Sequence, residues 1–133
     1  MNCFSIYGQQ NGKVYIDSLK GKSYEYFLEK LQVDEQDENS IVLSNAYLQK
    51  AKSEKNWKQM MNAYKIILHQ APKRQRIFYA DSMIVASRRT KENDLIGSAY
   101  LTKGIVYYDL QDFNNALDNY LIADEFIATT TDE

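Results

Sequence analysis

The chain has 133 residues, of which 44% are apolar and 26% are charged, a composition typical of one soluble domain with a hydrophobic core. Sixteen basic and 18 acidic residues give a net charge of −2, so no overall positive field attracts nucleic acid or anionic lipid. A single cysteine, Cys3, and a single histidine exclude an internal disulfide and leave too few ligands for a metal site of these residues; we expect neither a metal nor another cofactor.

The first 21 residues precede the first helical pattern. They begin with MNCFSIYGQQNGK, a short apolar stretch followed by small and polar residues. Two interpretations fit this composition: a flexible terminal segment, or the end of an export signal whose charged and apolar parts lie upstream of Met1. The two interpretations imply different locations: the cytoplasm for a chain with a flexible terminus, and the periplasm for an exported chain. No apolar run reaches the roughly 18 residues that a membrane-spanning helix needs, so we expect no membrane insertion.

From Lys22 onward, apolar residues recur at intervals of three and four, which predicts helices with one buried face. Six helices are predicted, and no stretch reads convincingly as a strand. The polar or helix-breaking stretches between the helices are DEQDEN (34–39), SEKN (53–56), Pro72, TKEND (90–94) and QD (111–112). The last helix is expected to run from Phe113 to about Ala128, with residues 129–133 frayed. The sequence thus predicts an all-α domain over residues 22–128, in which short connections make neighbouring helices antiparallel.

The predicted helices repeat with a period of 36 residues. Side-chain size is preserved when the sequence is shifted by this interval. The aligned sets are Ile41, Ile77 and Phe113 (large), Ser44, Ala80 and Ala116 (small), Leu48, Ile84 and Tyr120 (large), and Ala51, Ser87 and Ala123 (small). Small residues allow two helices to approach closely, because a ridge of side chains fits a groove only where the facing side chain is short. A period of this size is typical of stacked helical hairpins, none of which can bury its apolar face alone.

The last predicted hairpin resembles the tetratricopeptide repeat. The residues that carry the resemblance are Gly104, Tyr107, Phe113, Ala116, Tyr120 and Ala123. Ala80 occupies the equivalent small position one repeat earlier. The resemblance extends over residues 22–128, with a period slightly longer than the roughly 34 residues of the family. It implies a right-handed α–α superhelix of about three hairpins and six helices that serves as a protein-binding scaffold.

In this family the first helix of each hairpin lines a concave surface, so the resemblance implies a groove for a peptide or a partner protein. The residues that it assigns to the groove are Tyr26, Glu29, Lys30, Asn62, Lys65, Ile66, His69, Pro72, Ser98, Leu101, Thr102, Ile105 and Tyr108. The chain also looks like the divergent arrays of bacterial signalling proteins. An alternative is therefore the N-terminal sensor region of a longer transcriptional regulator or histidine kinase.

No sequence pattern for catalysis occurs, so we do not expect an enzyme. His69 has no recognisable partner for general-base chemistry, and we interpret it as a helix-end or groove residue. The run PKRQR (72–76), together with Arg88 and Arg89, places five positive charges near one repeat. These charges fit either a solvated face or a site for phosphate or an acidic peptide. No aromatic residues interleave the basic run, so we expect no nucleic-acid binding.

The sixth predicted helix carries apolar residues on more than one face. In addition to its core positions it carries the apolar residues Leu117, Leu121, Ile122, Phe126 and Ile127. The ends of a helical solenoid need polar capping helices, whereas Leu121 and Ile122 are expected to face outward. We therefore expect either further repeats or self-association through this helix.

Overall fold

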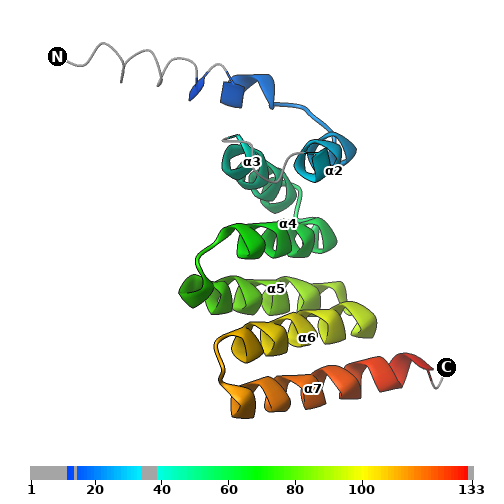
Figure 1. Cartoon of the computed structure of the whole chain (residues 1–133). Coiled ribbons are helices and arrows are strands. Elements are labelled where there is room, and N and C mark those ends of the chain that lie inside the picture. The colour runs from blue at the N-terminus through cyan, green and yellow to red at the C-terminus, as the bar shows by residue number, and fades with distance from the viewer. Residues whose placement is uncertain (1–11, 14, 34–38, 132–133) are drawn as a thin grey trace. The chain divides into compact units, whose positions relative to one another are not determined.

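The computed structural model describes residues 12–13, 15–33 and 39–131, and within these residues every regular element is helical and no strand occurs. The elements are α2 (Tyr24–Val33), α3 (Ser40–Ser53), α4 (Trp57–Gln70), the 3₁₀ turn η1 (Lys73–Gln75), α5 (Arg76–Thr90), α6 (Asn93–Asp109) and α7 (Phe113–Thr131) (Figure 1). The predicted all-α class is confirmed. Pro72 lies between α4 and η1, where its missing N–H and fixed φ suit the end of a helix.

Helix extends beyond the six segments that the sequence predicts. Residues 12–13 and 15–18 are helical, so part of the N-terminal segment that was expected to be flexible has regular structure. Helix α7 continues to Thr131, past its expected end at Ala128 and into the segment that was expected to fray. Cys3 lies outside the described residues, and so do residues 34–38, which make up most of the acidic run.

The chain divides into two compact units, Met1–Tyr47 and Leu48–Glu133, called unit 1 and unit 2 below. In unit 1, aromatic residues join α2 to the first part of α3. The buried rings of Phe27 and Tyr47 stack with their centroids 6.0 Å apart. Tyr24 meets the ring of Tyr47 edge-on at 5.8 Å. The apolar face that the sequence predicts for residues 24–31 is thus the face that α2 buries.

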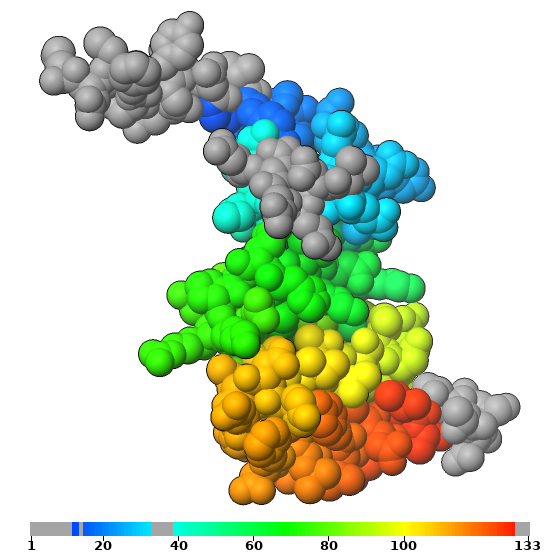
Figure 2. All heavy atoms as spheres, viewed as in Figure 1, coloured from blue at the N-terminus to red at the C-terminus, as the bar shows by residue number. Residues whose placement is uncertain are grey.

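Unit 2 contains α4, α5, α6 and α7, each of which packs on the next helix along the chain. Figure 1 shows these helices as successive layers, and Figure 2 shows the side chains of α6 and α7 in close contact. The main buried cluster in the core of unit 2 consists of Met61, Leu68, Ala80, Met83, Ile84, Ala86, Ala99 and Val106. Because α5 packs on both α4 and α6, it buries residues on two faces and contributes half of this cluster.

Gly104 lies where α6 and α7 approach each other closely. A Cβ atom at this position would lie 2.6 Å from the ring of Tyr120 and 3.2 Å from the carbonyl oxygen of Ala116. No real Cβ atom tolerates the first of these distances without a shift of its neighbours. The other predicted small positions, Ala80, Ala116 and Ala123, are buried as well. Short side chains thus permit the close helix packing that the 36-residue pattern predicts.

Three turns of unit 2 contain a residue with left-handed backbone torsions, and one of them is Gln111 between α6 and α7, with a φ value of 61°. Lys55, between α3 and α4, and Lys91, between α5 and α6, have φ values of 52° and 60°. These residues are one repeat period apart in the sequence, so the repeat is present in the backbone as well as in side-chain size. After the first turn, the Asn56 side chain accepts a hydrogen bond from the backbone N–H of Gln59 at 3.2 Å and caps α4.

Polar contacts also connect α5 to the last two helices. The ammonium group of Lys103 on α6 lies 2.7 Å from a carboxylate oxygen of Asp81 on α5. The guanidinium group of Arg88 lies over the rings of Tyr100 and Phe126, at 5.5 and 5.8 Å from their centroids. These two rings stack on each other at 5.9 Å. One arginine of α5 therefore contacts both helices of the following hairpin.

Candidate binding surface

Helix α6 exposes three apolar side chains on one face. Leu101, Ile105 and Tyr108 are 41%, 47% and 57% exposed, and their spacing of four and then three residues aligns them along the helix. The same helix buries Gly104 and Val106 on its other faces. A single exposed apolar residue is ordinary, whereas a continuous row is a feature of interaction sites. We call these three residues the α6 row; the sequence analysis assigns all three to the groove.

Two other predicted groove residues on α6 are less available. Ser98 and Thr102 are half-buried. The Thr102 hydroxyl donates a hydrogen bond to the carbonyl oxygen of Ser98 at 3.0 Å, so its proton is used within the helix. The binding potential of α6 therefore comes from its apolar side chains.

A second apolar row follows on α7. Phe113, Leu117 and Leu121, spaced four residues apart, are 57%, 56% and 56% exposed; we call them the α7 row. The rings of Tyr108 and Phe113 meet at 5.3 Å with an interplanar angle of 66°, which joins the two rows at the α6–α7 turn. The sequence predicts that Phe113 fills space between helices. It is exposed instead, because it begins α7 at the edge of the hairpin.

Three of the groove residues predicted on α4 carry polar groups, whereas the fourth, Ile66, is apolar and half-buried. Lys65 and His69 are exposed and Asn62 is half-buried. The carbonyl oxygen of His69 accepts a hydrogen bond from Nη2 of Arg76 at 3.4 Å, which ties the end of α4 to the start of α5. Helix α4 thus offers charge and hydrogen-bonding groups where α6 offers apolar surface.

The groove residues predicted on α2 belong to unit 1. The ring of Tyr26 is half-buried and lies beneath the ammonium groups of Lys22 and Lys30, at 5.0 and 5.8 Å from its centroid. Glu29 is exposed. The predicted groove residues therefore lie in two separate units, and the surface considered below is that of unit 2.

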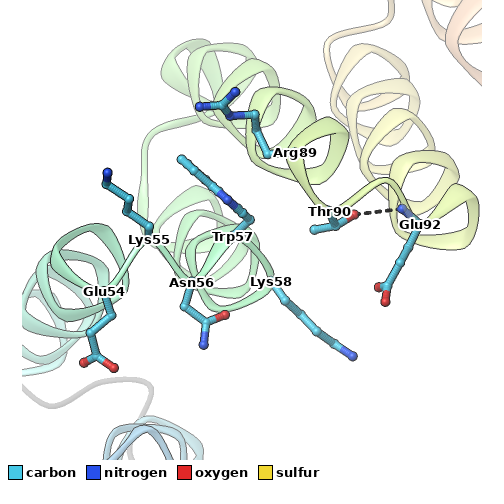
Figure 3. Close-up of a pocket in the computed structure, with 8 residues that line it drawn as sticks. All are labelled: Glu54, Lys55, Asn56, Trp57, Lys58, Arg89, Thr90 and Glu92. Atoms are coloured by element: carbon cyan, nitrogen blue, oxygen red, sulfur yellow. Dashed lines mark hydrogen bonds between the residues drawn. The ribbon is translucent and has the colours of Figure 1, made fainter.

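A depression between the α3–α4 and α5–α6 turns was not predicted from the sequence. It has a volume of about 430 Å³ and is lined by Glu54, Lys55, Asn56, Trp57, Lys58, Arg89, Thr90 and Glu92 (Figure 3). The guanidinium group of Arg89 lies 4.7 Å from the centroid of the Trp57 ring. The period that relates Lys55 to Lys91 indicates that the two turns share one edge, but nothing in the sequence pairs this ring with this arginine.

The five basic residues that the sequence places near one repeat do not form one cluster, which argues against a single anion site built from all five. The basic residues of 73–76 lie at the start of α5, whereas Arg88 and Arg89 lie at its end, about 20 Å away at a rise of 1.5 Å per residue. The two arginines also diverge from each other, since Arg88 contacts Tyr100 and Arg89 contacts Trp57. Only part of the predicted positive charge reaches any one site.

Metal sites and membrane-spanning helices are both absent from the described part of the chain. No group of three or more His, Cys, Asp and Glu side chains there is placed to hold a metal ion. No helix in that part is both long enough and apolar enough to cross a membrane.

The chain was compared with protein-family models, with curated proteins and with solved structures. It matches none of them. The geometry of the surface therefore carries the functional argument.

Proposed function

We propose that the domain is a non-catalytic protein-interaction module that binds a peptide or a partner protein on the α6 row. The observation that carries this proposal is the alignment of Leu101, Ile105 and Tyr108, all exposed, on one face of a helix that is packed on its other faces. Apolar side chains in such rows are the anchors through which helices and extended peptides are recognised.

The affinity would come from burial of apolar surface on a rigid support. Each large apolar side chain that becomes fully buried contributes roughly 1.5–3 kcal/mol. Because the backbone of α6 is ordered before the partner arrives, little conformational entropy is lost from this side of the interface. Tyr108 combines a large ring with a hydroxyl group, a combination that is frequent among the residues that dominate binding energy.

We also propose that the helices form a right-handed superhelix of three hairpins like that of the tetratricopeptide family. Its support is the 36-residue period, the close approach at Gly104 and the equivalent left-handed turns at Lys55 and Lys91. In such an array the first helices of successive hairpins line one face. Lys65 and His69 of α4 would then supply polar contacts beside the α6 row.

A selection of short random peptides on the immobilised chain tests the main proposal. We expect the selected peptides to share apolar residues at a fixed spacing. Ile105→Glu should weaken their binding by at least about tenfold, because it places a charge in the desolvated centre of the contact. The affinities are measured by fluorescence anisotropy of labelled peptides.

Val85→Glu is the matched control. Val85 is 66% exposed on α5 and lies outside the α6 row, so this variant makes the same chemical change elsewhere and should bind as the wild type does. Selected peptides that bind the Ile105→Glu and wild-type chains equally would place the binding site elsewhere. A library that yields no binder to the wild-type chain would reject peptide binding itself.

We further propose that two copies of the chain associate through the α7 row. Leu117 is one period after Asp81, which contacts Lys103 of the following helix. On α5 the position one period before Leu121 is Val85, which is 66% exposed, so the next hairpin covers only part of the corresponding face. In α7 the same face carries Leu117, which is more than half exposed.

A further inference from the structure

Three cations line the depression at the α3–α4 and α5–α6 turns. Lys55, Lys58 and Arg89 are all exposed, and among the described residues none of them forms a salt bridge. Of the two lining carboxylates, Glu54 lies 2.9 Å from the ammonium group of Lys50, which offsets its charge. The balance left at the depression is positive, although the whole chain has a net charge of −2.

An aromatic ring lies among these cations. The half-buried indole of Trp57 has the Arg89 guanidinium group 4.7 Å from its centroid. Figure 3 shows that Lys55 and Trp57 extend to the same side as Arg89, whereas Lys58 extends toward the side of Glu92. Stacking on the ring holds the planar guanidinium group in place and leaves its N–H groups available at its edge. A carboxylate could therefore meet Arg89 and Lys55 together while the carbon chain that carries it packs on the indole.

The backbone adds to the preference for negative charge. Helix α4 begins at Trp57, and the Asn56 side chain caps it through the N–H of Gln59. The N–H groups at the start of a helix carry partial positive charge. This effect is local, and it reinforces the Lys55 and Arg89 charges at the same edge of the depression.

The form of the depression favours a protein segment over a nucleic acid. Single-stranded nucleic acid is usually bound by several aromatic rings in succession, whereas Trp57 is the only aromatic residue of this lining. A volume of about 430 Å³ holds a few side chains.

We propose that this depression binds an acidic segment of a partner protein, with a carboxylate at Arg89 and Lys55 and an apolar stem on Trp57. The site is distinct from the α6 row. It lies at the turn edge of unit 2 and selects charge, whereas the α6 row selects apolar side chains.

Trp57 is the only tryptophan of the chain, so its fluorescence reports directly on the proposed site. The probe is a synthetic Glu-rich peptide with one central Leu and blocked ends, and a Lys-rich peptide of the same length is its control. We expect a saturable change of Trp57 emission with the acidic peptide and none with the basic one. Binding should weaken with added salt, because exposed charges are screened.

Arg89→Glu should weaken binding of the acidic peptide by at least about tenfold, since it reverses the charge at the proposed contact. Arg74→Glu makes the same change in η1, at the opposite end of α5, and should alter the affinity by less than about twofold because the charge is far beyond the screening length. Circular dichroism checks that both variants are folded. Lys55→Glu, in an exposed turn, gives a second test if Arg89→Glu does not fold.

Other results would overturn the proposal. Absence of a saturable change with the acidic peptide would show that the depression does not bind such segments. Equal weakening by Arg89→Glu and Arg74→Glu would show a diffuse charge effect in place of a site. Tighter binding of a single-stranded DNA oligonucleotide than of the acidic peptide would assign the surface to nucleic acid.

Discussion

At Gly104 the absence of a side chain lets the ring of Tyr120 lie against the backbone of α6. Glycine inside a helix is unfavourable by roughly 1 kcal/mol relative to alanine. The close packing of α6 and α7 offsets that cost. Gly97 lies two helical turns earlier in α6 and is also in a tight position. A Cβ atom added there would lie 2.8 Å from Cγ1 of Ile127.

Gly104→Ala should lower the free energy of unfolding by about 1 kcal/mol, because overpacking of about 1–3 kcal/mol outweighs the gain in helix propensity. Urea denaturation measures the change. In a Tyr120→Ala background the ring that the new Cβ would meet is gone and only the contact of 3.2 Å with the carbonyl oxygen of Ala116 remains, so Gly104→Ala should then destabilise clearly less. Equal destabilisation in both backgrounds would contradict the proposed clash.

The sequence predicts single residues well where one side chain is constrained by the repeat. Period and size assign Ala116 and Ala123 to tight positions, and the resemblance to the tetratricopeptide repeat assigns Gly104; all three are buried. The stacking of Arg89 on Trp57 was not predicted, since these residues are far apart in the sequence and no periodic pattern relates them. Such pairs depend on the way two turns meet in space.

Helix α5 contacts its neighbours through both apolar packing and one ion pair. Met83 is fully buried in the core of unit 2. The carboxylate of Asp81, in contrast, is half exposed to solvent in its contact with Lys103. Water therefore screens the ion pair but has no access to Met83.

We expect Met83→Ala to lower the free energy of unfolding by about 2–5 kcal/mol, through lost burial and the cavity that remains. Asp81→Asn should cost less than about 1 kcal/mol, because exposed ion pairs contribute little. Both values come from urea denaturation of the two variants beside the wild type. A larger loss for Asp81→Asn than for Met83→Ala would show that ion pairing, and not packing, holds α5 to α6.

At the level of elements, most of the architecture could be predicted because helices leave local signals. Apolar residues at intervals of three and four, with polar breaks between them, predict starts at Trp57, Arg76 and Phe113 that agree with the structure. The 3₁₀ turn η1 was not predicted, since three residues are too few to show a period. The helix at residues 15–18 was not predicted, because four residues are also too few to show a period. It lies next to the turn at Gly21.

The division into two units shows where prediction from the sequence ends for the whole molecule. The repeat relates α2 to α4 and α6, so the predicted groove residues Tyr26, Lys65 and Ile105 were assigned to one surface. The structure places Tyr26 in unit 1 and the other two in unit 2. A repeat pattern states which positions are equivalent, but their relative placement depends on contacts between segments that the pattern does not encode.

Self-association through the α7 row is a property of the whole molecule. We expect sedimentation velocity to show a dimer that forms with rising concentration in the micromolar range, and Leu117→Glu to keep the chain monomeric. Helix α7 carries Asp118, Asp124 and Glu125 and no basic residue, so two copies repel each other. Added salt should therefore strengthen the association by screening this repulsion.

Val85→Glu, which alters an equally exposed apolar residue on α5, should associate as the wild type does. A wild-type chain that stays monomeric throughout this concentration range would remove the α7 row as a contact surface.

The backbone torsions at Lys55 and Lys91 have one more consequence. Since both turns use a left-handed residue, a second copy of residues 55–90 inserted between them would meet its neighbours at turns with a lysine of the same backbone type. Duplication of this stretch would therefore require no new type of turn.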